Sequence, residues 1–236
     1  MSPRSSDSRS RPSGRMVVLA FSLAVAAAVA LVATALFLRD DGGSNGVAAP
    51  LVDLEGIPQD RLVLGSASAN VKLVEYADIQ CPFCGVYSVD VFPTIVDEYV
   101  RPGRVQTEYR GLAFLGPDSE KGLRYILAAG LQDKLWQVQE ALYARQGREN
   151  SGWVTDELVR ELAEDIPGLD VERMFVDAEG TEVGELMEEA TRQAQADQVP
   201  GTPTFFVQIG DDDPYRIEVP LEPAAFREAL DDALLG

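Results

Sequence analysis

The chain contains only two cysteines, and their position constrains its fold more than any other feature. Cys81 and Cys84 form a Cys-Pro-Phe-Cys motif between segments of different periodicity. The preceding residues 71–76 alternate and are rich in β-branched side chains, which predicts a strand, whereas the apolar residues of 85–99 recur at helical spacing. A second strand is expected over 105–112. The thiols are therefore predicted at the first strand-to-helix turn of a β-α-β unit.

The chain beyond this unit is predicted to be a helical stretch followed by two strands and a helix. Five segments between about 118 and 198 have helical spacing: 119–131, 134–146, 155–165, 171–178 and 182–197. Three residues have the side chains of helix N-caps: Asp118, Thr155 and Asp170. Strands over 205–209 and 215–219, and a helix over 222–235, complete the domain. The predicted fold class is α/β, in the order β-α-β, helical insertion, β-β-α.

A long apolar run lies near the N-terminus, within residues 16–38. It has no charge, glycine or proline, and as a helix it spans about 35 Å, which exceeds the roughly 30 Å hydrocarbon core of a bilayer. Four arginines precede it, so the positive-inside rule predicts a cytoplasmic segment over 1–15, a transmembrane anchor over 16–38 and an extracytoplasmic remainder. A cleaved signal peptide is the alternative. We expect a linker over 39–60 and a domain over 61–236.

Composition excludes several classes of protein. Histidine is absent, which excludes Ser-His-Asp triads, Cys-His proteases and zinc sites with imidazole ligands. The net charge of -19 argues against a nucleic-acid partner. Two cysteines are half of a four-ligand zinc site, and a permanent disulfide across so short a loop would remove little entropy from the unfolded chain. The pair is therefore interpreted as a reactive dithiol.

A thiol at the start of a helix has a chemical consequence. The unpaired N–H groups and the helix dipole favour the thiolate and lower the pKa of Cys81, which is expected to be the exposed thiol. A thiolate of low pKa is also a good leaving group, so a Cys81–Cys84 disulfide passes readily to another protein. Cys84, one turn inside the helix, is expected to be the resolving thiol. Pro82 and Phe83 lie between the two cysteines and support the site.

Three stretches resemble the DsbA-like thiol-disulfide oxidoreductases, which have a thioredoxin-like fold with a helical insertion. They are residues 71–85, ending in DIQCPFCG, residues 131–136 (LQDKLW) and residues 201–207 (GTPTFFV). The resemblance covers about residue 61 to the C-terminus. It implies that Cys81 is the nucleophile and Cys84 the resolving cysteine.

The resemblance also assigns roles outside the motif. It implies a cis peptide bond from Thr202 to Pro203 beside the cysteines, with the Thr202 backbone pairing with an extended substrate. It implies that Glu75 is a buried carboxylate that shuttles a proton to or from Cys84. From the residues alone, Glu75 can equally face solvent on its strand. Asp78 is expected to be a surface or turn acid.

One residue departs from the family pattern. Strongly oxidising members carry histidine at the position of Phe83, and a phenyl ring offers the thiolate neither a hydrogen bond nor a charge. We therefore expect the pKa of Cys81 to be lowered, but less far than the value of about 3.5 of DsbA itself. The reduction potential is expected between about -120 mV, as in DsbA, and about -270 mV, as in thioredoxin.

These observations predict a membrane-tethered extracytoplasmic enzyme that forms disulfide bonds in exported proteins with free thiols. No cofactor is expected beyond the Cys81–Cys84 disulfide. The resemblance implies reoxidation by a quinone-linked membrane protein, either DsbB-like or similar to vitamin K epoxide reductase. Two alternatives stay open: a reductase or isomerase of the same fold, and a membrane-tethered binder without enzymatic activity.

Overall fold

A computed structural model describes residues 52–235 of the chain. The expected cytoplasmic segment, the transmembrane anchor and most of the expected linker lie outside this range. Among the helices of residues 52–235, none is both long and apolar enough to cross a membrane. The folded part begins before residue 61, because Leu54 and Ile57 are buried and the first strand, β1, spans Gln59–Asp60.

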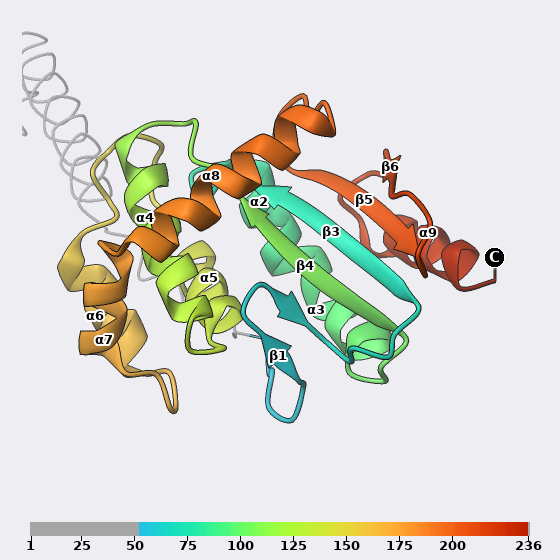
Figure 1. The fold of residues 1–236 in the computed structure, drawn as a ribbon, viewed down its shortest axis with the longest axis horizontal. Coiled ribbons are helices and arrows are strands. Elements are labelled where there is room, and N and C mark those ends of the chain that lie inside the picture. Colours follow the sequence, from blue (N-terminus) through green and yellow to red (C-terminus); the bar gives the residue numbers. More distant parts are fainter. Residues whose placement is uncertain (1–51, 236) are drawn as a thin grey trace, which may run out of the picture. The chain divides into compact units, whose positions relative to one another are not determined.

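The centre of the domain is a six-stranded sheet with the order β1-β2-β4-β3-β5-β6 (Figure 1). The central strand β3 (Val71–Ala77) runs parallel to β4 (Val105–Gly111) and antiparallel to β5 (Thr204–Ile209). Short strands extend both edges: β2 (Val63–Leu64) beside β4, and β6 (Tyr215–Ile217) beside β5. This topology confirms the predicted thioredoxin-like α/β fold.

The helix after β3 is less regular than its sequence predicts. It begins at Pro82, three residues before the expected start, and consists of α2 (Pro82–Val86), η1 (Tyr87–Val91), α3 (Phe92–Ile95) and η2 (Val96–Val100). η1 and η2 are π-helical turns. The proline at position 93 explains the first of them, because it lacks an N–H group and its ring clashes with the carbonyl group one turn earlier.

The predicted helical insertion is present between β4 and β5. It comprises α4 (Pro117–Gly130), α5 (Leu135–Ala144), α6 (Asp156–Glu164), α7 (Val171–Ala178) and α8 (Thr181–Ala196). Thr155 and Asp170 cap their helices as predicted, by accepting hydrogen bonds from the backbone N–H groups of Leu158 and Arg173. Asp118 does not cap α4.

The reason is that α4 starts two residues before the expected position 119, at Pro117, which suits the first turn of a helix. The Asp118 carboxylate instead accepts hydrogen bonds from the backbone N–H groups of Gly152 and Trp153.

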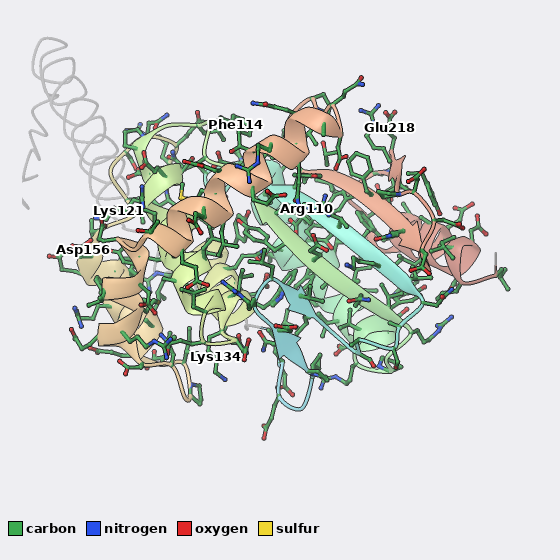
Figure 2. The ribbon with its side chains drawn as sticks, viewed as in Figure 1. Arg110, Phe114, Lys121, Lys134, Asp156 and Glu218 are labelled. Atoms are coloured by element: carbon green, nitrogen blue, oxygen red, sulfur yellow. The ribbon has the colours of Figure 1, made fainter. Side chains whose placement is uncertain are left out.

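The two faces of the sheet are covered differently. One face packs against the helical segment 82–100, α5 and the C-terminal helix α9 (Pro223–Leu235), with Trp136 stacked on Phe92 at 5.2 Å between ring centroids. Part of the opposite face packs against α8, which crosses in front of the sheet in Figure 1. Arg110, which is labelled in Figure 2, lies on that face. Its guanidinium group donates hydrogen bonds to the Tyr76 hydroxyl and to the carboxylate of Asp197, and the Tyr76 hydroxyl donates to the same carboxylate. The carboxyl end of β3 is left facing the helical insertion.

Candidate active site

The cysteine motif begins at the turn that follows β3. Cys81 is the N-cap residue of α2, and Pro82 occupies the first helical turn, where its missing N–H group costs no hydrogen bond. The backbone N–H of Cys81 donates to the carbonyl oxygen of Asp78 at 2.9 Å. Gly85 in turn donates to the Cys81 carbonyl oxygen at 3.2 Å. The turn therefore directs the first thiol toward the open N-terminus of the helix.

Cys81 has a thiol of lowered pKa. The largest cause is a hydrogen bond from Cys84, and hydrogen bonds from the Thr202 side chain and from the backbone N–H groups of Cys84 and Phe83 add to it, so that the pKa is about 6 despite the opposing effect of burial. This value agrees with the expected moderate lowering in the absence of an imidazole. The expectation that Cys81 is exposed was wrong, since only 5% of the residue is accessible.

The turn that carries Thr202 and Pro203 explains this burial. The peptide bond between these two residues is cis, as the resemblance implies. The Cys81 thiol donates a hydrogen bond to the Thr202 carbonyl oxygen at 3.2 Å. The Thr204 hydroxyl donates to the Gly201 carbonyl oxygen at 2.7 Å and closes the turn. Two segments about 120 residues apart in sequence thus form one reaction centre.

Cys84 and Glu75 lie beneath this centre and are inaccessible to solvent. Burial raises the pKa of the Cys84 thiol, and its hydrogen bond to Cys81 and the nearby charges of Cys81 and Glu75 raise it further. Burial also raises the pKa of Glu75 well above its usual value, and charge on Glu140 and Cys81 adds to the effect. Glu75 therefore does not face solvent on its strand. A neutral carboxyl group beside a thiol of high pKa can exchange a proton with it.

Comparison with known proteins identifies the arrangement. A family model described as thioredoxin matches residues 58–232. The chain belongs to this thioredoxin family.

The relatives of the chain include proteins named for disulfide bond formation. The chain is 33% identical, over 61% of its length and 68% of the relative, to a probable disulfide bond formation protein D of Bacillus anthracis. The structure of oxidised BdbD from Bacillus subtilis has a TM-score of 0.66 at 24% identity, covering 75% of this chain and 94% of that one. A thioredoxin-like oxidoreductase from Silicibacter pomeroyi has a TM-score of 0.58 at 28% identity, covering 76% and 93%. The chain is a DsbA-like protein disulfide oxidoreductase.

This thioredoxin-family site contains a second buried acid that the sequence did not reveal. Glu140 lies on α5 with 5% of its surface accessible, and it accepts a hydrogen bond of 2.8 Å from the Ser88 hydroxyl. Burial raises its pKa to about 8, although the Ser88 hydrogen bond lowers it. The signal available in the sequence was a lone acid among mostly apolar residues in the predicted helix 134–146.

Asp78 also differs from its prediction, because it is completely buried and not at the surface. Its carboxylate accepts hydrogen bonds from the backbone N–H groups of Gln80, Phe114 and Leu115, at 2.9, 3.0 and 3.2 Å. The Ser119 hydroxyl donates to it at 2.5 Å. Four donors from two separate segments satisfy the hydrogen-bonding capacity of this buried carboxyl group. Asp78 therefore joins the cysteine turn to the start of the helical insertion.

Gln146, which follows α5, makes a second connection between the insertion and the turn. Its side-chain amide donates to the carbonyl oxygens of Ile79 at 2.7 Å and Cys81 at 3.0 Å. Gly85 leaves room for this side chain, since a Cβ atom at position 85 would lie 2.5 Å from the Gln146 Oε1 atom. The glycine after Cys84 thus has a packing requirement.

The surface around the motif is apolar. Phe83 is 64% exposed and borders a groove of about 310 Å³ together with Pro203 and Leu221. Phe114, labelled in Figure 2, is 54% exposed. It borders a second groove, of about 480 Å³, between the loop after β4 and the end of α8. Exposed aromatic rings of this kind are typical of surfaces that bind other proteins.

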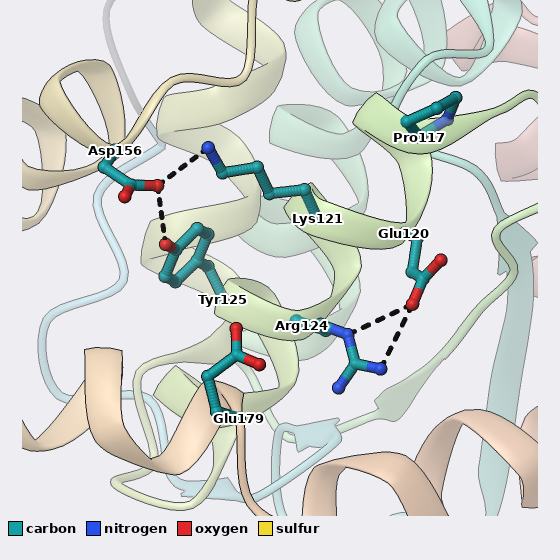
Figure 3. A pocket seen from close by; sticks show the side chains of 7 residues that line it. All are labelled: Pro117, Glu120, Lys121, Arg124, Tyr125, Asp156 and Glu179. Atoms are coloured by element: carbon teal, nitrogen blue, oxygen red, sulfur yellow. Dashed lines mark hydrogen bonds and ion pairs between the residues drawn. The ribbon is translucent and has the colours of Figure 1, made fainter.

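A further pocket, of about 330 Å³, lies in the helical insertion, away from the cysteines (Figure 3). Lys121 pairs with Asp156 at 2.7 Å, and the Tyr125 hydroxyl donates to the same carboxylate at 2.9 Å. Arg124 pairs with Glu120 at 3.1 Å. These side chains compensate one another's charge and connect α4 to the start of α6, so the pocket is best explained as part of the packing of the insertion.

Proposed function

We propose that the protein is a membrane-tethered, extracytoplasmic dithiol oxidase that forms disulfide bonds in exported proteins. The observation that carries this proposal is the opposite shift of the two thiols: the pKa of Cys81 is lowered to about 6, while that of Cys84 is raised. A stabilised Cys81 thiolate favours the reduced pair, and a pair that favours its reduced form is an oxidant of other thiols.

The reaction begins at Cys81. A substrate thiolate attacks its Sγ atom, since Cys84 is inaccessible. The Cys81–Cys84 bond breaks, and Cys84 leaves with the bonding electron pair and takes a proton from the neutral Glu75 carboxyl group. A second substrate thiolate then attacks the substrate sulfur of the mixed disulfide, and Cys81 leaves as the thiolate. Two electrons pass from the substrate to the cysteine pair, and Glu75 regains a proton from solvent.

Substrate binding uses the surface that surrounds Cys81. We assign the Thr202 backbone to pairing with an extended substrate segment, as in other cases of β-strand addition. The grooves beside Phe83 and Phe114 then receive apolar side chains on either side of the substrate cysteine. Such segments are exposed in proteins that have not finished folding, which suits an enzyme that acts on newly exported chains.

The proposed cellular setting rests on the sequence outside the described residues. The apolar run 16–38 and the arginines before it support a single-pass anchor with a cytoplasmic N-terminus. Each turnover leaves the cysteine pair reduced, so the next turnover requires a partner that accepts two electrons. We propose a quinone-linked partner, either DsbB-like or similar to vitamin K epoxide reductase.

A transfer experiment tests the direction of exchange. The oxidised full chain in detergent is mixed with a reduced, unfolded protein that has two cysteines. We expect one disulfide to appear per chain, none with Cys81→Ser, and a trapped mixed disulfide with Cys84→Ser. A chain that instead cleaves substrate disulfides is a reductase or isomerase. If Cys81→Ser suppresses aggregation as well as the wild type and neither transfers disulfides, the protein is a binder.

A further inference from the structure

Glu140 reaches the cysteine helix from a different part of the fold. It lies on α5, and α5 packs against α2 and η1. Ser88, whose hydroxyl donates to Glu140, is four residues after Cys84 and is 1% exposed. The helical insertion therefore places an acid next to the helix that carries both thiols.

Glu75 is the other acid of this interior. It pairs in register with Tyr109 of β4 and Phe205 of β5, and neither of its carboxyl oxygens has a hydrogen-bond partner within residues 52–235. The groups that interact electrostatically with it come from four helical or strand elements besides its own, namely α2 with its N-cap residue, η1, β4 and α5: Cys81, Cys84, Tyr87, Tyr109, Glu140 and Tyr143. In the described part of the chain, no lysine or arginine contributes to the pKa shift of either acid.

The two buried acids are electrostatically coupled. Burial raises the pKa of Glu140 to about 8, and burial also raises the pKa of Glu75 well above its usual value, with charge on Glu140 as the second cause. Charge on Glu140 therefore favours the neutral form of Glu75. Once Glu140 is charged, its anion opposes the formation of a second anion at Glu75, as in other pairs of interacting carboxyl groups.

We propose that Glu140 is a positioning residue that controls the delivery of a proton from Glu75 to Cys84. When Glu140 is neutral, the transfer leaves one buried anion, at Glu75. When Glu140 is ionised, the same transfer would leave two interacting buried anions, and no lysine or arginine within residues 52–235 contributes to the pKa shift of either acid. The rate of the first exchange step should therefore fall at alkaline pH, when Glu140 ionises. This inference rests on the proposed role of Glu75 as proton donor.

The test is the pH dependence of that step. The oxidised full chain in detergent is mixed with a dithiol peptide between pH 6 and 9.5, and the rate of mixed-disulfide formation is divided by the concentration of peptide thiolate. For the wild type we expect this rate to fall about tenfold from pH 7 to pH 9, as for a single proton lost near pH 8. For Glu140→Gln we expect no such fall, because the side chain cannot ionise.

Two further variants test the direction of the shift in the pH profile and its dependence on Glu140. Ser88→Ala removes the hydrogen bond that favours the Glu140 anion, so the fall should move to higher pH. Glu164→Gln, a change on the exposed end of α6, should leave the wild-type profile unchanged. A loss of stability alone would lower the rate without removing its alkaline fall.

Glu75→Gln separates this inference from the proposed function. A slower reaction at pH 7 in Glu75→Gln, together with an unchanged fall in Glu140→Gln, would refute the role of Glu140 and keep that of Glu75. A wild-type rate at pH 7 in Glu75→Gln would refute proton donation by Glu75 itself. If Glu140→Gln does not fold, the Ser88→Ala profile decides, and a fall at the wild-type pH overturns the inference.

Discussion

The thiol of Cys81 lies 3.2 Å from the carbonyl oxygen of Thr202, a residue 121 positions later in the chain. The Thr202 side chain also stabilises the Cys81 thiolate by a hydrogen bond. The turn that covers Cys81 therefore also lowers the pKa of its thiol. The site lacks an imidazole between the cysteines. The hydrogen bonds from the Cys84 thiol and from the Thr202 side chain therefore provide much of the stabilisation of the Cys81 thiolate.

Replacing Thr202 by valine should raise the pKa of Cys81 above its value of about 6, because the hydroxyl group that favours the thiolate is lost. The pH dependence of Cys81 alkylation in the reduced chain measures this change. Thr202→Ser, which keeps the hydroxyl group, is the matched control and should titrate as the wild type does. An unchanged titration in Thr202→Val would show that the backbone N–H groups suffice.

Replacing Glu140 by glutamine should stabilise the protein at neutral pH. An unfolded glutamate ionises near pH 4.5, whereas Glu140 keeps its proton up to about pH 8. In this window the native state binds a proton that the unfolded state has released, so stability declines as the pH rises. Glutamine avoids this loss, which corresponds to about 3 kcal/mol at pH 7.

Urea unfolding of the reduced chain at pH 4 and pH 7 measures the effect. The advantage of Glu140→Gln should be close to zero at pH 4, where unfolded glutamate is largely protonated, and should appear at pH 7. An advantage of the same size at both pH values would contradict the assignment of a protonated Glu140.

The effect of Gly85→Ala on the unfolding free energy should change sign when Gln146 is also replaced. In the wild type, Gly85→Ala forces the Gln146 side chain away from two carbonyl oxygens, and we expect a destabilisation of about 1 kcal/mol. In a Gln146→Ala background the same change should stabilise the helix by about 0.5–1 kcal/mol, as alanine normally does relative to glycine. A double-mutant cycle of unfolding free energies measures the coupling. Additive changes would show that the two side chains act independently.

Asp78 should be among the residues on which stability depends most. Asp78→Ala leaves four buried donors without their acceptor, and we expect a loss of about 3 kcal/mol or more in unfolding free energy. Asp213→Ala, at an exposed position in the turn before β6, is the control and should change it by less than about 0.5 kcal/mol. Equal effects of the two substitutions would refute the structural role of Asp78.

The sequence predicts those features that depend on neighbouring residues. The strand at 71–76, the thiols at its end and the five helices of the insertion all follow from local periodicity and capping residues. Glu140 and Asp78 could not be found in this way. The residues next to Asp78 indicate only an acid in a turn. Three of the four donors to its carboxylate come from the distant residues 114, 115 and 119. The environment of Glu140 depends on Ser88, 52 residues earlier, which contacts it because α5 packs against η1.

The resemblance to the DsbA-like family indicated two features that the sequence pattern alone does not decide. Periodicity does not decide whether Glu75 faces the core, and nothing local distinguishes the Thr202–Pro203 turn from an ordinary loop. The π-helical turns were missed for a related reason, since Pro93 interrupts a helix whose apolar spacing otherwise looks regular.

The most direct test of the proposed oxidase is the reduction potential of the Cys81–Cys84 pair, measured in glutathione buffers by trapping free thiols. A thiolate stabilised at Cys81 predicts a value between about -120 and -200 mV, which suits a donor of disulfides. A value near about -270 mV, as in thioredoxin, would contradict the proposal and indicate a reductase.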